Sequence, residues 1–318
     1  MKKILKFAHG AVNMAVLAAI LLVLAFGCYC LWDSRQIYAA AAPARYEKYK
    51  PAHGEQLPFE ALQLVNPEVV AWLTVYGTHI DYPVAQGQDN LWYINRDILG
   101  KHSLSGAIFL DADCGGDFAD FNSILHGHHM AKNAMFGDIG LFADRAYFGA
   151  RRYGCLYYAG REHGLEFFAF VHTSAYDASL YRTGIAGETQ RQAYLRLLLR
   201  AAMHTRAGVS VGAGERIVLL STCSSSSTNG RDILVGKITD AVHADPFQTA
   251  AAAAQADTLA RMPVWCLAAL GALLLVLPAA LLVYFARKKK KRLLSRGKRD
   301  FAEALKAGEE DEDWQDEV

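Results

Sequence analysis

Residues 217–238 read IVLLSTCSSSSTNGRDILVGKI: an apolar run that ends in a thiol, then a polar loop, then a second apolar run that begins beside an arginine. Both runs are rich in β-branched and aliphatic residues and are separated by Ser, Asn and Gly, which predicts two strands joined by a loop. If the two strands pair, Cys223 and Arg231 lie close together. A thiol at a strand end, next to a flexible polar loop, is placed to meet a substrate.

A second stretch, residues 125–130 (LHGHHM), supplies histidines. A nearby imidazole can activate a cysteine for acyl transfer, and a fixed cation can stabilise the oxyanion that forms. Metal binding is the alternative for these histidines. However, no cysteine or carboxylate lies close by at ligand spacing, and the nearest acids are Asp120 and Asp138. We therefore expect no metal and no cofactor.

A buried, inert cysteine is the duller interpretation of Cys223, because free cysteines are often core residues. The Ser-rich loop that directly follows it argues against that interpretation. Cys114 and Cys155 also lie in the central part of the chain. They either form a disulfide, which would leave Cys223 as the odd thiol, or remain two free cysteines.

Two apolar stretches, residues 11–32 and 263–286, are long enough to cross a hydrocarbon core of about 30 Å. For the first, a cleaved signal peptide is the alternative, with a cut in the alanine run at 39–42. Basic residues on the outer flanks of both stretches place both termini in the cytoplasm and the segment between them outside the cell. The net charge of +1 implies no nucleic-acid partner.

The expected organisation follows from these stretches. It comprises a cytoplasmic N-terminus (1–10), a transmembrane helix (11–32), an Ala-rich stalk (33–56), a folded outer domain (57–246), a juxtamembrane helix (247–262), a second transmembrane helix (263–286) and a basic, then acidic, cytoplasmic tail (287–318). Many short β-rich runs in the outer domain predict a barrel or sandwich. One helix, residues 189–203, interrupts them, with a capping box at its start.

The order and spacing of several motifs resemble the sortases, the membrane-anchored cysteine transpeptidases of Gram-positive bacteria, and class B most closely. The active-site strand of that family, T-L-x-T-C, is similar to residues 219–223, where Leu219 replaces the first Thr. The family's Gly-His corresponds to Gly127-His128 and its arginine to Arg231. Further matches are residues 66–73, 80–84, 90–94 and 106–111, and the helix at 189–203 falls where class B carries an extra helix. The resemblance covers about residues 59–242.

This resemblance implies a mainly β protein: an eight-stranded sortase-type β-barrel with inserted and N-terminal helices, flanked by the two transmembrane helices. It implies that Cys223 attacks a C-terminal sorting signal, that His128 protonates the leaving amine, and that Arg231 holds the substrate or the oxyanion. The residues implied to line the substrate groove are Asn90, Ile94, Tyr181, Ser221 and Thr222. The implied partners are sorting-signal-bearing surface or pilin proteins, the lipid-linked peptidoglycan precursor as amine acceptor, and the membrane.

The second apolar stretch departs from class B, whose members usually have one N-terminal anchor, and resembles the pilus-building class C. The Asp-Pro-aromatic lid motif of class C is absent from residues 33–60. We expect wall anchoring, with pilin polymerisation through a lysine as the alternative. A cysteine hydrolase with the same triad and a non-catalytic membrane protein are the remaining hypotheses.

Overall fold

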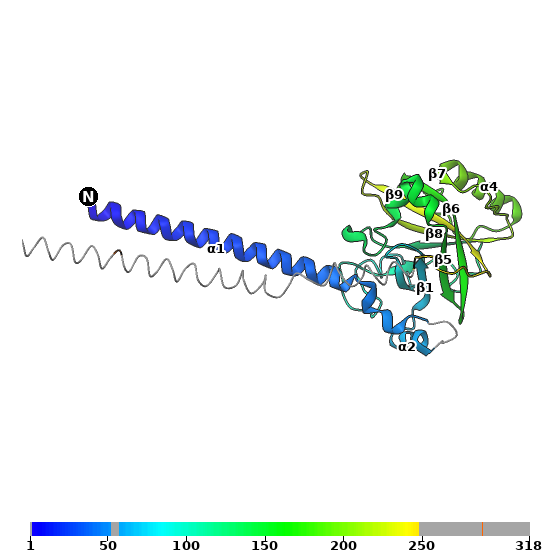
Figure 1. The fold of residues 1–318 in the computed structure, drawn as a ribbon, viewed down its shortest axis with the longest axis horizontal. Coiled ribbons are helices and arrows are strands. Elements are labelled where there is room, and N and C mark those ends of the chain that lie inside the picture. Colours follow the sequence, from blue (N-terminus) through cyan, green and yellow to red (C-terminus); the bar gives the residue numbers. More distant parts are fainter. Residues whose placement is uncertain (1, 52–56, 248–287, 289–318) are drawn as a thin grey trace, which may run out of the picture. The chain divides into compact units, whose positions relative to one another are not determined.

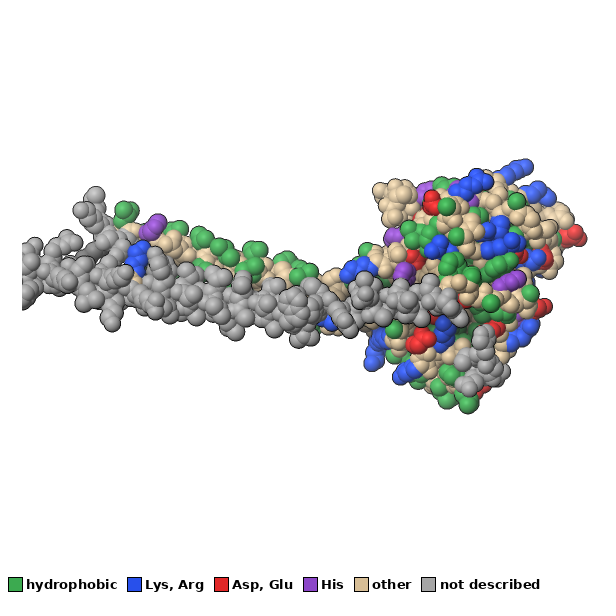
Figure 2. Space-filling view, viewed as in Figure 1, with side chains coloured by type: hydrophobic (Ala, Val, Ile, Leu, Met, Phe, Trp, Pro, Cys, Tyr) green, Lys and Arg blue, Asp and Glu red, His purple; other side chains and the backbone are tan. Residues whose placement is uncertain are grey.

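The computed structural model describes residues 2–51, 57–247 and 288. It begins with one long helix, α1 (Lys2–Ala40), whose segment Phe7–Ala40 is long and apolar enough to cross a membrane. Apolar side chains stand exposed along this helix (Figure 2). The helix contains the expected span at 11–32 and continues through residues 33–40, the first part of the expected stalk.

The next described part of the expected stalk, residues 41–50, lies against the folded domain. Two short 3-10 helices, η1 (Pro43–Arg45) and η2 (Glu47–Tyr49), follow α1. Tyr46 and Ala41 are buried, and the Tyr82 hydroxyl donates a 2.8 Å hydrogen bond to the Ala41 carbonyl. An alanine-rich composition suggested an extended linker, but small side chains also allow the close approach that is seen here.

The expected second transmembrane helix (263–286) lies outside the described residues. So do residues 248–262 of the juxtamembrane helix and, apart from residue 288, the cytoplasmic tail. The chain divides into two compact units, and the unit Ala25–Ala253 contains the folded domain.

Within the described residues, eight strands form a closed barrel, which confirms the predicted fold of the outer domain. Their order is β5-β1-β2-β3-β4-β8-β9-β6, and β6 pairs back with β5. A further short strand, β7, pairs with β6 outside this ring. The strands are β1 (Val69–Val75), β2 (Asp81–Ala85), β3 (Ile108–Leu110), β4 (Asn122–His126), β5 (Tyr153–Tyr158), β6 (Arg161–Ser174), β7 (Ala202–Thr205), β8 (Arg216–Cys223) and β9 (Gly230–Thr239).

Besides η1 and η2, five helices complete the described part of this domain (Figure 1). They are α2 (Leu57–Val65), η3 (Ala131–Asn133) with η4 (Ile139–Ala143) and α3 (Arg145–Ala150) between β4 and β5, and α4 (Glu188–Ala201). The insertion predicted at 189–203 is α4, but the predicted capping box is wrong. Gly187 is the N-cap, with φ of 79°, and no side chain caps the helix. A glycine adopts this backbone conformation without the steric cost that other residues meet.

Strand β8 has two buried faces, and this positions the site. Val218 and Leu220 belong to the large apolar cluster inside the barrel. Ile217 and Leu219 belong to a second cluster, together with Tyr194, Leu195 and Leu198 of α4. Because side chains alternate along a strand, Ser221 and Cys223 continue the face of Leu219, and Thr222 continues the face of Leu220.

Candidate active site

The thiol and the guanidinium meet at the ends of two antiparallel strands. Cys223, the last residue of β8, pairs in register with Arg231 of β9. The side chain of Cys223 is exposed, and Arg231 Nη1 lies 3.2 Å from its Sγ. The intervening loop is closed by hydrogen bonds from Ser224 N to Gly230 O and from Gly230 N to Ser227 O. A fixed cation is therefore in contact with a thiol that solvent can reach.

Strand β4 brings His128 to the same end of the barrel. β4 runs parallel to β8, with His126 opposite Ser221. Continued by two residues, this register places His128 level with Cys223. The Thr222 hydroxyl donates a 2.8 Å hydrogen bond to the Gly127 carbonyl, which fixes the chain on the N-terminal side of the histidine.

The ring of His128 is oriented by a backbone group. Its Nε2 lies 2.8 Å from the carbonyl oxygen of Ile94. A carbonyl oxygen only accepts hydrogen bonds, so Nε2 carries the proton in this arrangement. Nδ1 has no hydrogen-bond partner among the described residues and is the nitrogen left to exchange a proton.

A buried carboxylate supports the neighbouring histidine. Asp111 Oδ2 lies 2.9 Å from both His126 Nε2 and Asn90 Nδ2, and the Ala112 N–H donates to Asn90 Oδ1. Burial alone would raise the pKa of Asp111, but the hydrogen bonds from His126, the Asp113 N–H and Asn90 outweigh it and hold that pKa below its usual value. Asp111 is therefore ionised at neutral pH, and it was not singled out in the sequence.

The expected groove residues divide into two groups. The Tyr181 hydroxyl lies 2.8 Å from the Ser221 hydroxyl, and its ring stacks on His126 at 6.3 Å between centroids. Ser221 thus lies on the face of β8 that carries Cys223, and Tyr181 packs against the same face. Thr222 lies on the opposite face, is 3% exposed, and uses its hydroxyl on Gly127.

The two other cysteines of the described barrel are free and buried. Burial raises the pKa of the Cys114 thiol to about 11 and that of the Cys155 thiol to about 12. Both thiols are thus protonated at neutral pH and shielded from reagents. The structure contains no Cys114–Cys155 disulfide, which leaves the second of the two predicted alternatives.

Two more histidine–aspartate pairs lie near this end of the barrel. His172 Nδ1 is 2.7 Å from Asp232 Oδ1, and Asp232 is the register partner of Thr222. His79 Nδ1 is 2.9 Å from Asp138 Oδ2, a contact that raises the pKa of His79 against the opposing effect of burial. The partners are about sixty positions apart in sequence. From the sequence, Asp138 was considered only as an acid near the histidine cluster and Asp232 was not considered, because neither pairing is visible in a local motif.

An exposed cysteine, an arginine on its sulfur and a backbone-oriented histidine at one end of a closed barrel define the site of a cysteine acyl-transfer enzyme. No family model matches the chain. It is 30% identical over 179 residues to the sortase B of Listeria monocytogenes, a match that covers 56% of this chain and 72% of that protein. The chain belongs to the sortase family and is a class B cysteine transpeptidase.

Solved structures agree with this assignment. The sortase B from the type II pilus of Streptococcus pneumoniae is 49% identical, with a TM-score of 0.51, covering 57% of this chain and 99% of that one. The Staphylococcus aureus sortase B–substrate complex is 29% identical, with a TM-score of 0.54, covering 58% of this chain and 85% of that one.

Proposed function

We propose that this enzyme is a membrane-anchored sortase that cleaves a C-terminal sorting signal of exported proteins through a thioacyl-enzyme. The acyl group then passes to an amine of the cell-wall precursor. The observation that carries this proposal is the 3.2 Å contact between Arg231 Nη1 and Cys223 Sγ, with His128 at the adjoining strand end.

In the first half-reaction, the Cys223 thiolate attacks the carbonyl carbon of the scissile bond. The resulting oxyanion faces the Arg231 guanidinium, whose fork of N–H groups stabilises the charge. Protonated His128 gives the Nδ1 proton to the departing amine, which leaves as the C–N bond breaks. The product is a thioester on Cys223 and a neutral His128.

In the second half-reaction, His128 Nδ1 removes a proton from the incoming amine as the amine nitrogen attacks the thioester carbonyl carbon. The C–S bond breaks, the thiolate is released, and an amide bond has replaced the original one. Water in place of the amine would give the free acid. Throughout, the Ile94 carbonyl holds Nε2 and keeps the ring in one orientation.

The groove for the sorting peptide is proposed along Asn90, Ile94, Tyr181 and Ser221. Asn90 is held by Asp111 and Ala112, and Ser221 by Tyr181, so these side chains form a fixed surface beside the sulfur. Thr222 contributes by fixing the Gly127 carbonyl, next to the catalytic histidine.

For the location, we propose that α1 anchors the enzyme in the cell membrane with the barrel outside the cell. The apolar length of Phe7–Ala40 supports an anchor, and the lysines at positions 2, 3 and 6 support a cytoplasmic N-terminus. A second span at 263–286, with residues 287–318 in the cytoplasm, remains part of the proposal.

Pilin polymerisation is the second candidate function. The 49% identity to a sortase B from a type II pilus favours it, and in that reaction a lysine of another subunit would be the acceptor. The test is expression with a lysine-bearing pilin-like protein. Covalent ladders of high molecular weight would show that the enzyme polymerises pilins, and this function would then take the place of wall anchoring.

The direct experiment uses the purified full-length enzyme in detergent with a library of sorting-signal peptides and an amine. Mass spectrometry should show cleavage with transfer to the amine, and no product with Cys223→Ala. That variant keeps its fold because the replaced side chain is exposed. Acid as the sole product, even with excess amine, would identify a hydrolase instead.

A further inference from the structure

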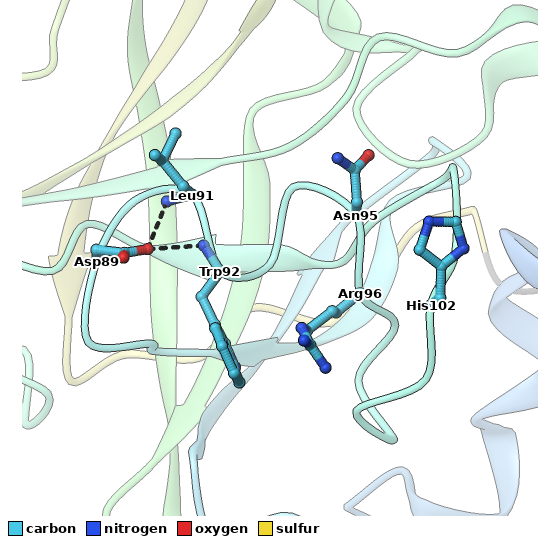
Figure 3. A pocket seen from close by; sticks show the side chains of 6 residues that line it. All are labelled: Asp89, Leu91, Trp92, Asn95, Arg96 and His102. Atoms are coloured by element: carbon cyan, nitrogen blue, oxygen red, sulfur yellow. Dashed lines mark hydrogen bonds between the residues drawn. The ribbon is translucent and has the colours of Figure 1, made fainter.

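A surface cavity lies on the loop between β2 and β3, outside the residues assigned to the reaction. Its volume is about 350 Å³, large enough for a short peptide segment. Figure 3 shows its lining: Asp89, Leu91, Trp92, Asn95, Arg96 and His102.

The cavity and the active site share this loop. Lining residues alternate with residues proposed for the sorting-peptide groove, since Asn90 stands between Asp89 and Leu91, and Ile94 directly precedes Asn95. The Ile94 carbonyl also binds His128 Nε2 at 2.8 Å. The cavity therefore shares its loop with the carbonyl group that orients His128 and with Asn90, whose amide is held by Asp111.

Arg96 gives the cavity a cation without a protein counterion. Its guanidinium lies 4.0 Å from the centroid of the Trp92 ring, and Nη1 makes one long hydrogen bond, 3.4 Å, to the Gly100 carbonyl. Among the described residues, no carboxylate pairs with Arg96. Asp89, the acid of the lining, accepts hydrogen bonds from the N–H groups of Leu91 and Trp92 through Oδ1, as Figure 3 shows.

The remainder of the lining is apolar surface with hydrogen-bond donors. Leu91 is 73% exposed and Trp92 is 46% exposed, although both are large and hydrophobic. The side chains of Asn95 and His102 are exposed and make no hydrogen bond within the described residues. An unpaired guanidinium beside exposed apolar side chains matches a peptide end that carries a small apolar side chain and a free carboxylate.

We propose that this cavity binds the amine acceptor, by pairing Arg96 with the C-terminal carboxylate of an acceptor peptide whose last side chain packs on Leu91 and Trp92. The inference rests on the proposed transpeptidation. A sorting signal is cleaved within a longer chain and has no free carboxylate at that point, whereas a short acceptor peptide carries both the amine that attacks and a free C-terminal carboxylate. The cavity therefore suits the second substrate and not the first.

The test measures transfer by the full-length enzyme in detergent to Gly-Gly-Ala as the free acid and as its C-terminal amide, with acceptors of increasing length in parallel. We expect kcat/KM for the acceptor to be about tenfold higher for the acid, the size of a partly exposed charge-assisted pair. Arg96→Gln should remove this preference for the acid acceptor. It should leave unchanged the rate at which the sorting peptide is hydrolysed when no acceptor amine is present. Lys101→Gln, which removes a neighbouring charge outside the cavity lining, should retain the preference.

If the wild type transfers to the peptide acid and to the peptide amide at equal rates, the proposal is overturned. That result would favour a lysine side chain as the acceptor. Loss of sorting-peptide cleavage in Arg96→Gln would also overturn it, because the cavity would then serve the first substrate. If the wild type cleaves no sorting peptide, the proposed function fails. Binding of the peptides to the cavity is then measured through the fluorescence of Trp92, which is identified as the part of the signal that Trp92→Phe removes. Quenching of the Trp92 fluorescence by the peptide acid, but not by the peptide amide or by an N-acetylated disaccharide, would support the cavity assignment. Quenching by the amide or by the disaccharide, but not by the acid, would refute it.

Discussion

At the scale of single residues, the proposed chemistry depends on the contact between Arg231 and Cys223, because in the proposed reaction the same guanidinium also binds the oxyanion that forms when the sulfur attacks the carbonyl carbon. Lysine would keep the charge but lose the planar fork. Arg231→Lys should therefore lower kcat/KM for sorting-peptide cleavage about a hundredfold, as loss of an oxyanion donor does. A rate within a few-fold of wild type would show that charge alone is sufficient.

The histidines at positions 126, 128 and 129 give a second prediction. His128→Ala should lower kcat by a factor of about 10²–10⁴, the usual contribution of a general acid or base. His126→Ala and His129→Ala should have much smaller effects on kcat, since His126 is engaged with Asp111 and the proposed reaction assigns no proton transfer to His129. Steady-state kinetics of the three variants decide this, and a dominant effect of His129→Ala would mean that the assigned register is wrong.

The cysteines differ in burial, which predicts selective labelling. An alkylating reagent at neutral pH should modify Cys223 in the folded barrel and leave Cys114 and Cys155 unmodified, because burial raises the pKa values of those two thiols to about 11 and about 12. Peptide mapping by mass spectrometry, repeated in denaturant, provides the measurement and its control. Early labelling of either buried thiol would contradict this burial.

Residue identity also marks the limit of prediction from sequence. Cys223, Arg231 and the Gly127-His128 pair could be selected because each lies in a short local motif. Asp111 could not, since it is 15 positions from His126 and becomes its partner only through the pairing of β3 with β4. The lining of the Arg96 cavity was missed for the same reason, because loop conformation and not loop sequence brings its side chains together.

At the scale of elements, the parallel pair β4–β8 aligns the histidine with the cysteine, and Thr222 connects the two strand ends. Thr222→Val keeps the shape of the side chain and removes the hydroxyl that bonds the Gly127 carbonyl. We expect a loss of about 1 kcal/mol in the free energy of unfolding and a fall in kcat with KM nearly unchanged. Denaturant titration and kinetics measure the two effects, and unchanged kcat would mean that this bond does not position His128.

The elements themselves were largely predictable. Short β-rich runs indicated the strands, and the apolar spacing indicated α4, whereas its start was misplaced because Gly187, not a side-chain cap, begins the helix. The burial of Ala41 and Tyr46 was not predicted, since the composition of their segment resembles a linker and the surface that they cover forms only on folding.

At the scale of the whole molecule, the His79–Asp138 pair connects the β1–β2 turn with η4 and makes stability depend on pH. The pKa of His79 is raised, so the pair stabilises the protein fully below the ordinary histidine value of about 6.5 and loses that contribution as pH rises through the raised pKa. The gap in Tm between wild type and His79→Gln should therefore be larger near pH 6 than at alkaline pH. A gap that is constant with pH would rule out this linkage.

The pairing of β4 with β8 also fixes when the enzyme becomes active during its own synthesis. Gly127 and Thr222 are hydrogen-bonded neighbours in the fold but 95 positions apart in the chain. The histidine is thus made long before the cysteine, and neither has its neighbour until the late strands are inserted into the sheet. A thiol without a base beside it lacks the group that activates it for acyl transfer. The newly made chain is consequently latent, and it acquires reactivity only with the closure of its barrel.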